Sequence, residues 1–224
     1  MARFTRIQVA LTMAETGLIP VFYHKNLETC KQAVKACYEG GIRVFEFTNR
    51  GDFAHEVFGP LNQWAAKEYP EMILGVGSVV DAGTTSLYIQ LGANFIVSPL
   101  LNADMAKVCN RRKIAWSPGC GSLSEVSQAE ELGAEIVKIF PGSSVGGPAF
   151  VKNIKGPCPW SSIMPTGGVE PTEENLSAWF KAGVTCVGMG SNLFPKEATE
   201  GGNWQKVTEL CRNALALIQK IRGK

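Results

Sequence analysis

The stretch Gly133-Ala134-Glu135-Ile136-Val137-Lys138 carries the pattern that decides the fold: a glycine ends a helix-like segment, and a short run of β-branched or aromatic residues follows within two positions. The pattern occurs three more times, at residues 41–46, 92–97 and 183–188. Glycine takes the left-handed conformation that stops a helix. Short runs of Val, Ile and Phe suit a strand that is buried on both faces. The repeat therefore predicts alternating helices and parallel strands.

Counting all such units gives about eight strands, with helical stretches such as 27–39 and 122–132 between them. Eight units in 224 residues favour an α/β fold with a single (β/α)8 TIM barrel, and a doubly wound open sheet is the alternative. No linker or change of composition divides the chain, so we expect one domain over residues 1–224. The expected strands are 18–23, 43–47, 72–76, 94–97, 114–116, 135–139, 161–164 and 185–187.

The first eleven residues predict an amphipathic helix that leads into the first strand, because Phe4, Ile7, Ala10 and Leu11 recur at helical spacing. This segment lacks the continuous apolar region and the small-residue cleavage site of a secretory signal. No apolar run in the chain reaches the ~18–20 residues of a membrane helix. We therefore expect neither secretion nor a membrane partner.

Charge and cysteine content narrow the classes of function. The chain has 22 basic and 20 acidic residues, a net charge of +2, which gives no electrostatic footprint for nucleic acid or a membrane surface. The chain has seven cysteines, an odd number, and no two of them form a C-x-x-C motif. Both facts argue against a disulfide framework or a structural zinc site. We expect reduced thiols and a cytoplasmic protein. Two histidines are too few for a histidine-rich catalytic metal centre, so no metal is expected.

Two charged residues stand inside predicted strands, close to the ends where a barrel builds its active site. Glu46 and Lys138 each come five residues after the glycine that ends the preceding helix. Equal offsets predict similar heights in the barrel, so the carboxylate and the amine are expected to face each other near its mouth. The alternative interpretations are a structural ion pair and a lysine that buries its aliphatic chain while its ammonium group reaches solvent.

A buried lysine beside a glutamate suits one kind of chemistry in particular. A desolvated amine favours its neutral form and can attack a ketone carbonyl to form an iminium. The iminium accepts electrons when the adjacent carbon–carbon bond breaks, which leaves an enamine. A neighbouring carboxylate can move the protons that these steps require. The sequence therefore predicts a Schiff-base aldolase with Lys138 as the nucleophile, Glu46 as the proton shuttle and no cofactor.

Two glycine-containing segments predict an anion site. Pro165-Thr166-Gly167-Gly168 follows the seventh predicted strand, and Gly188-Met189-Gly190-Ser191 follows the eighth. Barrels commonly bind phosphate at the loops after these two strands, through backbone N–H groups that glycine leaves accessible. A tight turn would explain either segment alone, but their joint position favours phosphate binding.

Three further residues past strand ends are candidates for substrate binding. Arg50 comes four residues after Glu46, where a guanidinium could hold a carboxylate with two hydrogen bonds. Ser78 and Pro99 follow the third and fourth predicted strands and could line the pocket. An exposed arginine and ordinary turn residues are the alternative interpretations.

These motifs together resemble the 2-keto-3-deoxy-6-phosphogluconate (KDPG) aldolase family, which includes 4-hydroxy-2-oxoglutarate (KHG) aldolases. The matching motifs run in family order over about residues 15 to 195, and the pair Lys-x-Phe-Pro and Pro-Thr-Gly-Gly is fairly specific. They are Glu46-Phe47-Thr48-Asn49-Arg50, Gly75-Val76-Gly77-Ser78-Val79, Ser98-Pro99, Pro118-Gly119, Lys138-Ile139-Phe140-Pro141, Pro165-Thr166-Gly167-Gly168 and Gly190-Ser191.

The resemblance implies a role for each matching position. Lys138 would form the Schiff base with pyruvate, and Glu46 would be the general acid/base. Arg50 and Ser78 would hold the region of the pyruvyl carboxylate. Phe140 and Thr166 would line the pocket. The phosphate would be received by Gly167, Gly168, Gly190 and Ser191. The resemblance also implies a homotrimer.

Some positions depart from the family pattern and leave the aldehyde half of the substrate open. Ser78 stands where threonine is common, Ser117 replaces a common aliphatic residue or threonine, and Gly142-Ser143 stands where an Ala-Glu pair is frequent. KDPG, its galactonate epimer, an unphosphorylated sugar acid and KHG are all candidate substrates. A barrel that binds phosphate ligands without chemistry, and another phosphate-binding enzyme such as an isomerase or synthase, are the competing functions.

Overall fold

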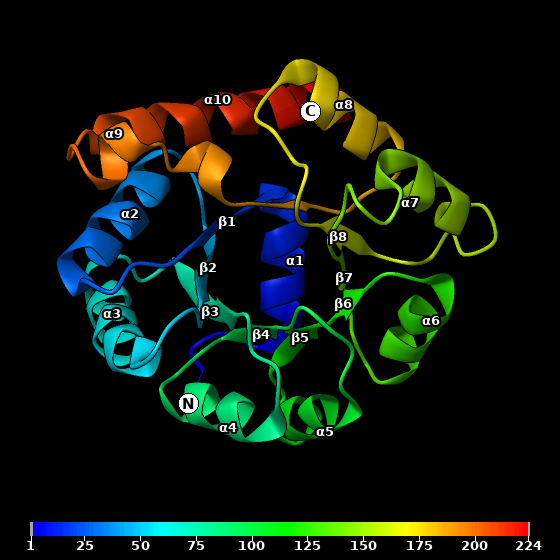
Figure 1. The fold of residues 1–224 in the computed structure, drawn as a ribbon, viewed down its shortest axis with the longest axis horizontal. Helices are drawn as coiled ribbons and strands as arrows, with labels where there is room; N and C mark the ends of the chain where they lie inside the picture. Colours follow the sequence, from blue (N-terminus) through cyan, green and yellow to red (C-terminus); the bar gives the residue numbers. More distant parts are fainter. Residues whose placement is uncertain (1, 224) are drawn as a thin grey trace.

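The computed structural model describes residues 2–223. Its strands form a curved parallel arrangement with helices along the outside, and helix α1 (Arg6–Thr16) lies within the ring of strands when viewed along the short axis (Figure 1). The strands are β1 (Leu18–Phe22), β2 (Val44–Thr48), β3 (Ile73–Gly77), β4 (Phe95–Val97), β5 (Ala115–Ser117), β6 (Gly119–Cys120), β7 (Val137–Ile139), β8 (Ile163–Pro165) and β9 (Val187–Met189).

Hydrogen bonds divide the strands between two parallel sheets, with the orders β5-β4-β3-β2-β1-β9 and β6-β7-β8. Pro118, which has no N–H, separates β5 from β6 and marks the point where the segment changes partner from β4 to β7. An isolated parallel bridge joins Thr166 to Gly188, between β8 and β9. The α/β class and the curved parallel sheet are confirmed, whereas one continuous closed barrel of eight strands stays a prediction.

Helices follow the strands along the outside of the sheet, as the repeat predicted (Figure 1). They are α2 (Leu27–Glu39), α3 (Ala54–Glu68), α4 (Ala82–Gln90), α5 (Ala103–Arg112), α6 (Leu123–Glu131), α7 (Gly147–Lys155), α8 (Glu173–Lys181), α9 (Lys196–Thr199) and α10 (Trp204–Arg222), with a 3₁₀ turn η1 (Ser191–Leu193) after β9.

The glycines of the repeat have the conformation that the sequence required. Gly41, Gly92, Gly133 and Gly183 have φ angles of 99°, 91°, 87° and 98°, all in the left-handed region. Each stands between a helix and the next strand, so these four positions stop the helix and turn the chain toward the sheet.

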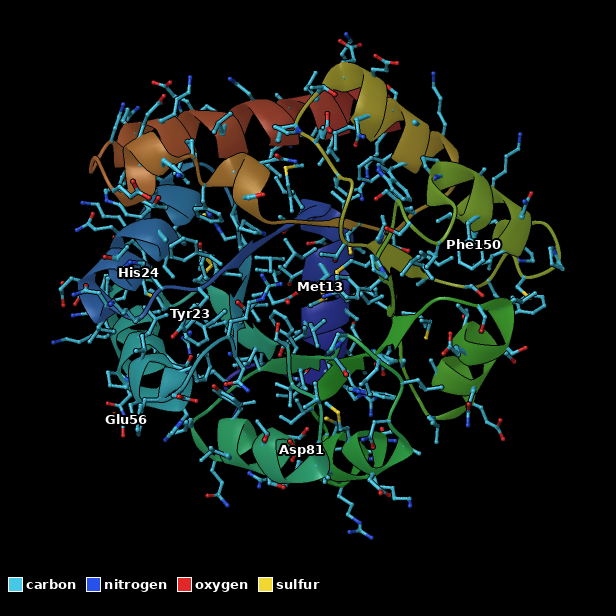
Figure 2. The ribbon with its side chains drawn as sticks, in the orientation of Figure 1. Met13, Tyr23, His24, Glu56, Asp81 and Phe150 are labelled. Atoms are coloured by element: carbon cyan, nitrogen blue, oxygen red, sulfur yellow. The ribbon has the colours of Figure 1, made fainter. Side chains whose placement is uncertain are left out.

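A first apolar cluster fills the interior of the ring near the amino ends of the strands. Val9 and Met13 of α1 (Arg6–Thr16) pack against it, and α1 contacts β1, β2 and β5. Figure 2 shows Met13 near the centre of the ring. Helix α1 therefore covers the amino end, which leaves the carboxyl end for a ligand. The buried members are Val9, Met13, Ile19, Val44, Ile73, Phe95, Val97, Ala115, Ile136, Met164 and Cys186.

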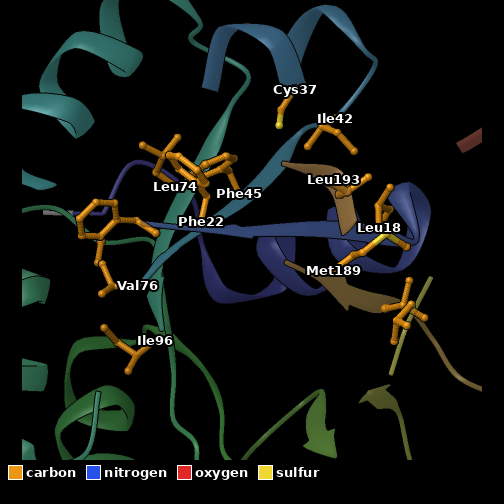
Figure 3. Close-up of a cluster of buried hydrophobic side chains, with 14 of the residues drawn as sticks. Leu18, Phe22, Cys37, Ile42, Phe45, Leu74, Val76, Ile96, Met189 and Leu193 are labelled. Atoms are coloured by element: carbon orange, nitrogen blue, oxygen red, sulfur yellow. The ribbon is translucent and has the colours of Figure 1, made fainter. Parts of the chain in front are cut away.

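A second, larger cluster lies between the strands and the outer helices. Figure 3 shows part of it, with Phe45 and Leu74 of the strands, Val76 beside Ile96, and Cys37 of α2 among the labelled side chains. Burying one such large apolar side chain contributes about 1.5–3 kcal/mol. Alternate strand residues thus enter the inner and outer clusters, which fixes which strand positions face the interior.

A helix precedes the first strand as predicted, but it spans Arg6–Thr16 rather than the first eleven residues, and part of its expected apolar face is exposed. Val9 and Met13 are buried, while Ile7 and Leu11 are 66% and 58% exposed. Phe4 and Ala10 pack against the inner cluster as expected. Val9 and Met13 are four residues apart and therefore lie on one face of the helix, which packs into the ring of strands. Ile7 and Leu11 are two positions away from them and fall on the opposite face.

The described residues 2–223 contain no helix that combines the length and apolar content needed to span a bilayer. All seven cysteines are free thiols, and six of them are buried.

Candidate active site

Lys138 of β7 and Glu46 of β2 meet inside the ring of strands. Their neighbours Val44 and Ile136, two residues earlier, belong to the inner cluster, so strand alternation directs both charged side chains inward. Lys138 Nζ lies 3.7 Å from Glu46 Oε1. The two residues are only 5% and 1% exposed. The prediction that the carboxylate and the amine face each other is therefore confirmed as geometry.

Glycines of β3 create the space that the glutamate occupies. A Cβ on Gly77 would lie 1.8 Å from Glu46 Oε1, and a Cβ on Gly75 would lie 2.3 Å from the ring of Phe95. Gly75 and Gly77 pair with Glu46 and Thr48 in the parallel register of β2 and β3. The inner face of β3 thus carries no side chain at the level of the carboxylate.

Burial dominates the electrostatics of Glu46 and raises the pKa of its carboxyl group above 4.5, while the positive charges of Lys138 and Arg50 oppose the shift. Neither Glu46 Oε1 nor Oε2 has a hydrogen-bond partner among residues 2–223. Lys138 Nζ also lies 5.1 Å from the centre of the Phe140 ring. A carboxyl group with a raised pKa and no bonded partner is suited to accept and return a proton.

A cavity of about 490 Å³ opens at the carboxyl ends of the strands. Phe140 joins it to the buried pair, because this ring both lines the cavity and approaches Lys138 Nζ. Of the predicted site residues, six more line the cavity: Arg50, Thr166, Gly167, Gly168, Gly190 and Ser191.

Ser78 and Pro99 are not among the residues that line this cavity. Ser78 is nevertheless tied to it, because Arg50 Nε donates a hydrogen bond to Ser78 Oγ at 3.4 Å. The backbone of Ser78 has φ 59°, in the left-handed region that serine rarely adopts. Pro99 lies against Gly119, where a Cβ would meet the Pro99 carbonyl oxygen at 2.4 Å, so the Pro99 backbone packs closely on β6.

Thr166 brings an unpartnered hydroxyl to the cavity wall. Its Oγ1 is buried and has no hydrogen-bond partner among residues 2–223. A Cβ on Gly188 would lie 2.3 Å from this oxygen, so the glycine of β9 leaves room for it. The hydroxyl can therefore donate to a ligand that enters the cavity.

The Gly167-Gly168 turn presents its N–H groups rather than its carbonyls. The Gly167 oxygen accepts a hydrogen bond from the Ser143 nitrogen at 3.1 Å. The Gly168 oxygen accepts from Asn175 Nδ2 and Trp179 Nε1. Gly167 and Gly168 have φ 93° and 75°. With both carbonyls engaged and both conformations left-handed, the turn is suited to an anionic ligand.

Several cavity residues escaped the sequence interpretation. Thr48 could have been found, because it stands two residues after Glu46 and strand alternation places it on the same face. Tyr23 and Asn192 lie just beyond strand ends and carried no recognisable pattern. Asn192 Nδ2 donates to the Val169 carbonyl at 2.8 Å, which fastens the loop after β9 to the loop after β8. The other unpredicted lining residues are Val21, Phe22, Val169 and Phe194, whereas Gly188 belongs to the predicted anion segment.

No group of three or more metal-ligating side chains occurs within the part of the chain that the structure describes. Cys120 is buried, and burial raises the pKa of its thiol to about 12.

Comparison with known proteins gives one consistent result. A family model described as KDPG and KHG aldolase matches residues 9–210. The chain is 36% identical over 201 residues to the 2-dehydro-3-deoxy-phosphogluconate aldolase of Pseudoalteromonas atlantica, which covers 89% of this chain and 90% of that protein. It is 33% identical over 207 residues to the KHG/KDPG aldolase of Escherichia coli, with coverage of 92% and 94%.

Solved structures agree. The KDPG aldolase of Legionella pneumophila, with pyruvate captured as a covalent carbinolamine intermediate, superposes with a TM-score of 0.81 at 30% identity and covers 91% of this chain and 96% of its own. A 4-hydroxy-2-oxoglutarate/KDPG aldolase structure gives a TM-score of 0.80 at 27% identity, with coverage of 93% and 98%. With a family match over most of its length and relatives above 30% identity, this chain belongs to the KDPG and KHG aldolase family.

Proposed function

We propose that this protein is a class I aldolase that cleaves KDPG to pyruvate and glyceraldehyde 3-phosphate, with Lys138 as the nucleophile and Glu46 as the general acid/base. The observation that carries the proposal is the buried pair, in which Lys138 Nζ lies 3.7 Å from a Glu46 carboxylate whose oxygens accept no hydrogen bond among residues 2–223. A purely structural buried ion pair needs those hydrogen bonds to offset its desolvation.

The proposed reaction begins when the neutral Lys138 amine attacks the C2 ketone and forms a carbinolamine. Glu46 delivers the proton that lets water leave, which gives an iminium. The C4 hydroxyl then loses its proton as the C3–C4 bond breaks. The bond electrons move to the iminium, C4 leaves as an aldehyde, and an enamine of pyruvate remains on Lys138. Protonation at C3 and addition of water release pyruvate and the free amine.

The two ends of the substrate require different contacts. We propose that Arg50, oriented by its hydrogen bond to Ser78, binds the C1 carboxylate near the pyruvyl end. The backbone N–H groups of Gly167, Gly168, Gly190 and Ser191 would bind the C6 phosphate. The cavity residues Phe140 and Thr166 lie between these sets in the proposed binding mode, and Pro99 would act from outside the cavity wall.

KHG is the second proposed substrate, cleaved by the same steps to pyruvate and glyoxylate. The support is the name of the Escherichia coli relative, which includes both activities. Only the electrophilic fragment differs between the two reactions, because the Schiff base forms on the pyruvyl half in each.

Borohydride trapping tests the covalent step. Incubation with pyruvate and borohydride should add a pyruvate-derived mass to the Lys138 peptide, and Lys138→Ala should abolish both the adduct and turnover. Lys152→Ala, an exposed lysine of α7, is the matched control and should keep both. A wild-type protein that forms no adduct would refute the proposal.

A coupled pyruvate-release assay then ranks the substrates: KDPG, its galactonate epimer, the unphosphorylated sugar acid and KHG. Turnover of KDPG is the expected result. Thermal stabilisation by sugar phosphates without turnover of any keto acid would instead indicate a barrel that binds phosphate ligands without chemistry.

The same proposal extends to architecture and assembly. We infer that the two sheets act as one closed (β/α)8 barrel in a single domain, supported by the Thr166–Gly188 bridge and by the hydrogen bond from the Thr185 nitrogen to the Ile163 oxygen at 2.8 Å. We also infer a homotrimer that requires no metal, because the iminium itself accepts the electrons. Sedimentation analysis and an assay in the presence of a chelator test these two points.

A further inference from the structure

The loop between β7 and α7 lies directly beside the proposed phosphate turn. Backbone hydrogen bonds fix its position: the Gly142 nitrogen donates to the Thr166 oxygen at 2.8 Å, and the Ser143 nitrogen donates to the Gly167 oxygen at 3.1 Å. These bonds continue the parallel pairing of β7 with β8 beyond the strand ends. Ser143 is therefore held in register with Gly168.

The Ser143 side chain lies against the Gly168 backbone. A Cβ on Gly168 would lie 2.4 Å from Ser143 Cβ and 2.7 Å from Ser143 Oγ. Because the nitrogen of any residue lies about 2.5 Å from its Cβ position, the Gly168 nitrogen and the Ser143 hydroxyl are at most roughly 5 Å apart. One phosphate group spans that gap, since two hydrogen bonds of about 2.7–2.9 Å can reach it from either side.

The Ser143 hydroxyl is available for such a bond. Ser143 is exposed, and the hydrogen bonds described for this residue engage its backbone N–H and carbonyl rather than its Oγ. The Gly168 carbonyl is held away by Asn175 and Trp179. No acidic side chain lines the cavity, so nothing in its wall repels an anion.

We propose that Ser143 is a further binding residue, which together with the Gly168 N–H recognises a dianionic phosphate at the aldehyde end of the substrate. The residue at position 143 thereby sets the preference of the enzyme for phosphorylated over unphosphorylated 2-keto acids. The inference rests on the proposed aldolase function and deepens it, because it concerns one end of the same substrate. Residue 143 affects the binding of the substrate rather than the covalent steps at Lys138.

The neighbouring Ser144 offers a matched control, since it is also exposed, and the three atoms nearest to a Cβ on Gly168 all belong to Ser143 rather than to Ser144. The experiment measures kcat and KM for KDPG and for the same sugar acid without its phosphate, which is uncharged at the aldehyde end, in the wild type, Ser143→Ala, Ser143→Glu and Ser144→Glu. Inhibition by inorganic phosphate is measured in the same four proteins.

Ser143→Glu should raise KM for KDPG at least tenfold, because a carboxylate then faces the phosphate dianion, and should weaken inhibition by phosphate by a similar factor. Ser143→Ala should raise KM for KDPG three- to tenfold. KM for the unphosphorylated sugar acid should change less than twofold in both variants, which also shows that they are folded. Ser144→Glu should change KM for KDPG less than threefold.

Equal changes for both substrates in Ser143→Glu, or no change for KDPG, would overturn this inference while the aldolase function stands. Equal increases of KM for KDPG in Ser143→Glu and Ser144→Glu would overturn it as well, because any added negative charge in this loop would then have the same effect. A wild-type protein that cleaves neither substrate and traps no pyruvate would refute the proposed function, and this inference with it.

Discussion

Gly77 faces Glu46 so closely that a Cβ at position 77 would lie 1.8 Å from the carboxylate oxygen Oε1. The glutamate can reach its position beside Lys138 only because the facing residue of β3 has no side chain. This relationship makes Gly77 a positioning residue for the proposed general acid/base.

Gly77→Ala is therefore expected to lower kcat at least a hundredfold, because the added methyl group displaces the carboxylate from Lys138. KM should change little. Gly75→Ala is the matched control: its added methyl meets Phe95 instead, and overpacking should cost about 1–3 kcal/mol of stability in either variant. Steady-state kinetics corrected for the folded fraction check this. Equal losses of kcat in the two variants would contradict the assigned role.

Replacement of the buried carboxylate changes both activity and the pH dependence of stability. Glu46→Gln should lower kcat by about 10²–10⁴-fold, the usual contribution of general acid–base catalysis. Burial raises the pKa of Glu46 above 4.5 in the folded protein. The folded state then binds this proton more tightly than the unfolded chain does, so its stabilising contribution is present at low pH and is lost as pH rises through the folded pKa.

Urea denaturation of the wild type and Glu46→Gln over a series of pH values above 4.5 measures this effect. The free energy of unfolding of the wild type should fall relative to that of the variant as pH increases. Two curves that stay parallel throughout would show that the carboxyl pKa is not raised.

Arg50 provides a prediction about the carboxylate end of the substrate. Arg50→Lys keeps the charge but loses the two-pronged geometry, so KM for KDPG and for KHG should both rise about ten- to hundredfold. Because every candidate substrate carries the pyruvyl carboxylate, the increase should be the same for each of them. An increase confined to phosphorylated substrates would assign Arg50 to the other end of the cavity.

Ser78 combines a hydrogen bond to Arg50 with a left-handed backbone, and two substitutions separate these properties. Ser78→Ala and Ser78→Gly both remove the hydroxyl and should raise KM to a similar extent. Ser78→Gly also relieves the strain at φ 59°, so it should be about 1 kcal/mol more stable than Ser78→Ala. Thermal denaturation alongside kinetics checks both points, and equal stability of the two variants would argue against backbone strain.

Thiol labelling tests the packing of both apolar clusters, because Cys30 and Cys109 belong to the outer cluster and Cys186 to the inner one. Cys158 is the one partly exposed cysteine, whereas burial raises the pKa of Cys30 to about 11 and those of Cys109 and Cys186 to about 12. Under native conditions at pH 8, iodoacetamide should modify Cys158 first, as read from peptide masses. Cys158→Ser should remove the fast phase. Rapid modification of Cys109 or Cys186 would show that the interior opens.

The order of elements could be predicted because the glycines of the repeat each need one conformation. Gly41 and Gly133 stop a helix five residues before Glu46 and Lys138, and this spacing fixed the heights of both charged residues. The boundaries were less accurate: the strand expected at 185–187 is Val187–Met189. A run of apolar residues does not specify which of its members pair, since hydrogen bonding to the neighbouring strand decides that.

What the sequence missed depends on three-dimensional context. Ile7 and Leu11 fit the helical pattern of apolar residues, yet the opposite face of α1 is the one that packs into the ring of strands and is buried. Ser78 and Pro99 follow strand ends as expected, but the cavity is lined by residues from other strand ends, such as Tyr23 and Asn192. A linear pattern identifies the end of the sheet where a site lies, whereas only the folded structure shows which of the residues there line the cavity.

Helix α1 covers the amino end of the ring, so in the proposed mechanism both fragments leave through the cavity at the carboxyl end. Lys138 is buried beside Phe140 of the cavity wall, so the fragment bound to it stays enclosed until the other fragment has departed. The aldehyde should then be the first product to leave and pyruvate the last. In the condensation direction pyruvate must enter first, and an excess of aldehyde should obstruct it, a pattern that product-inhibition kinetics would reveal.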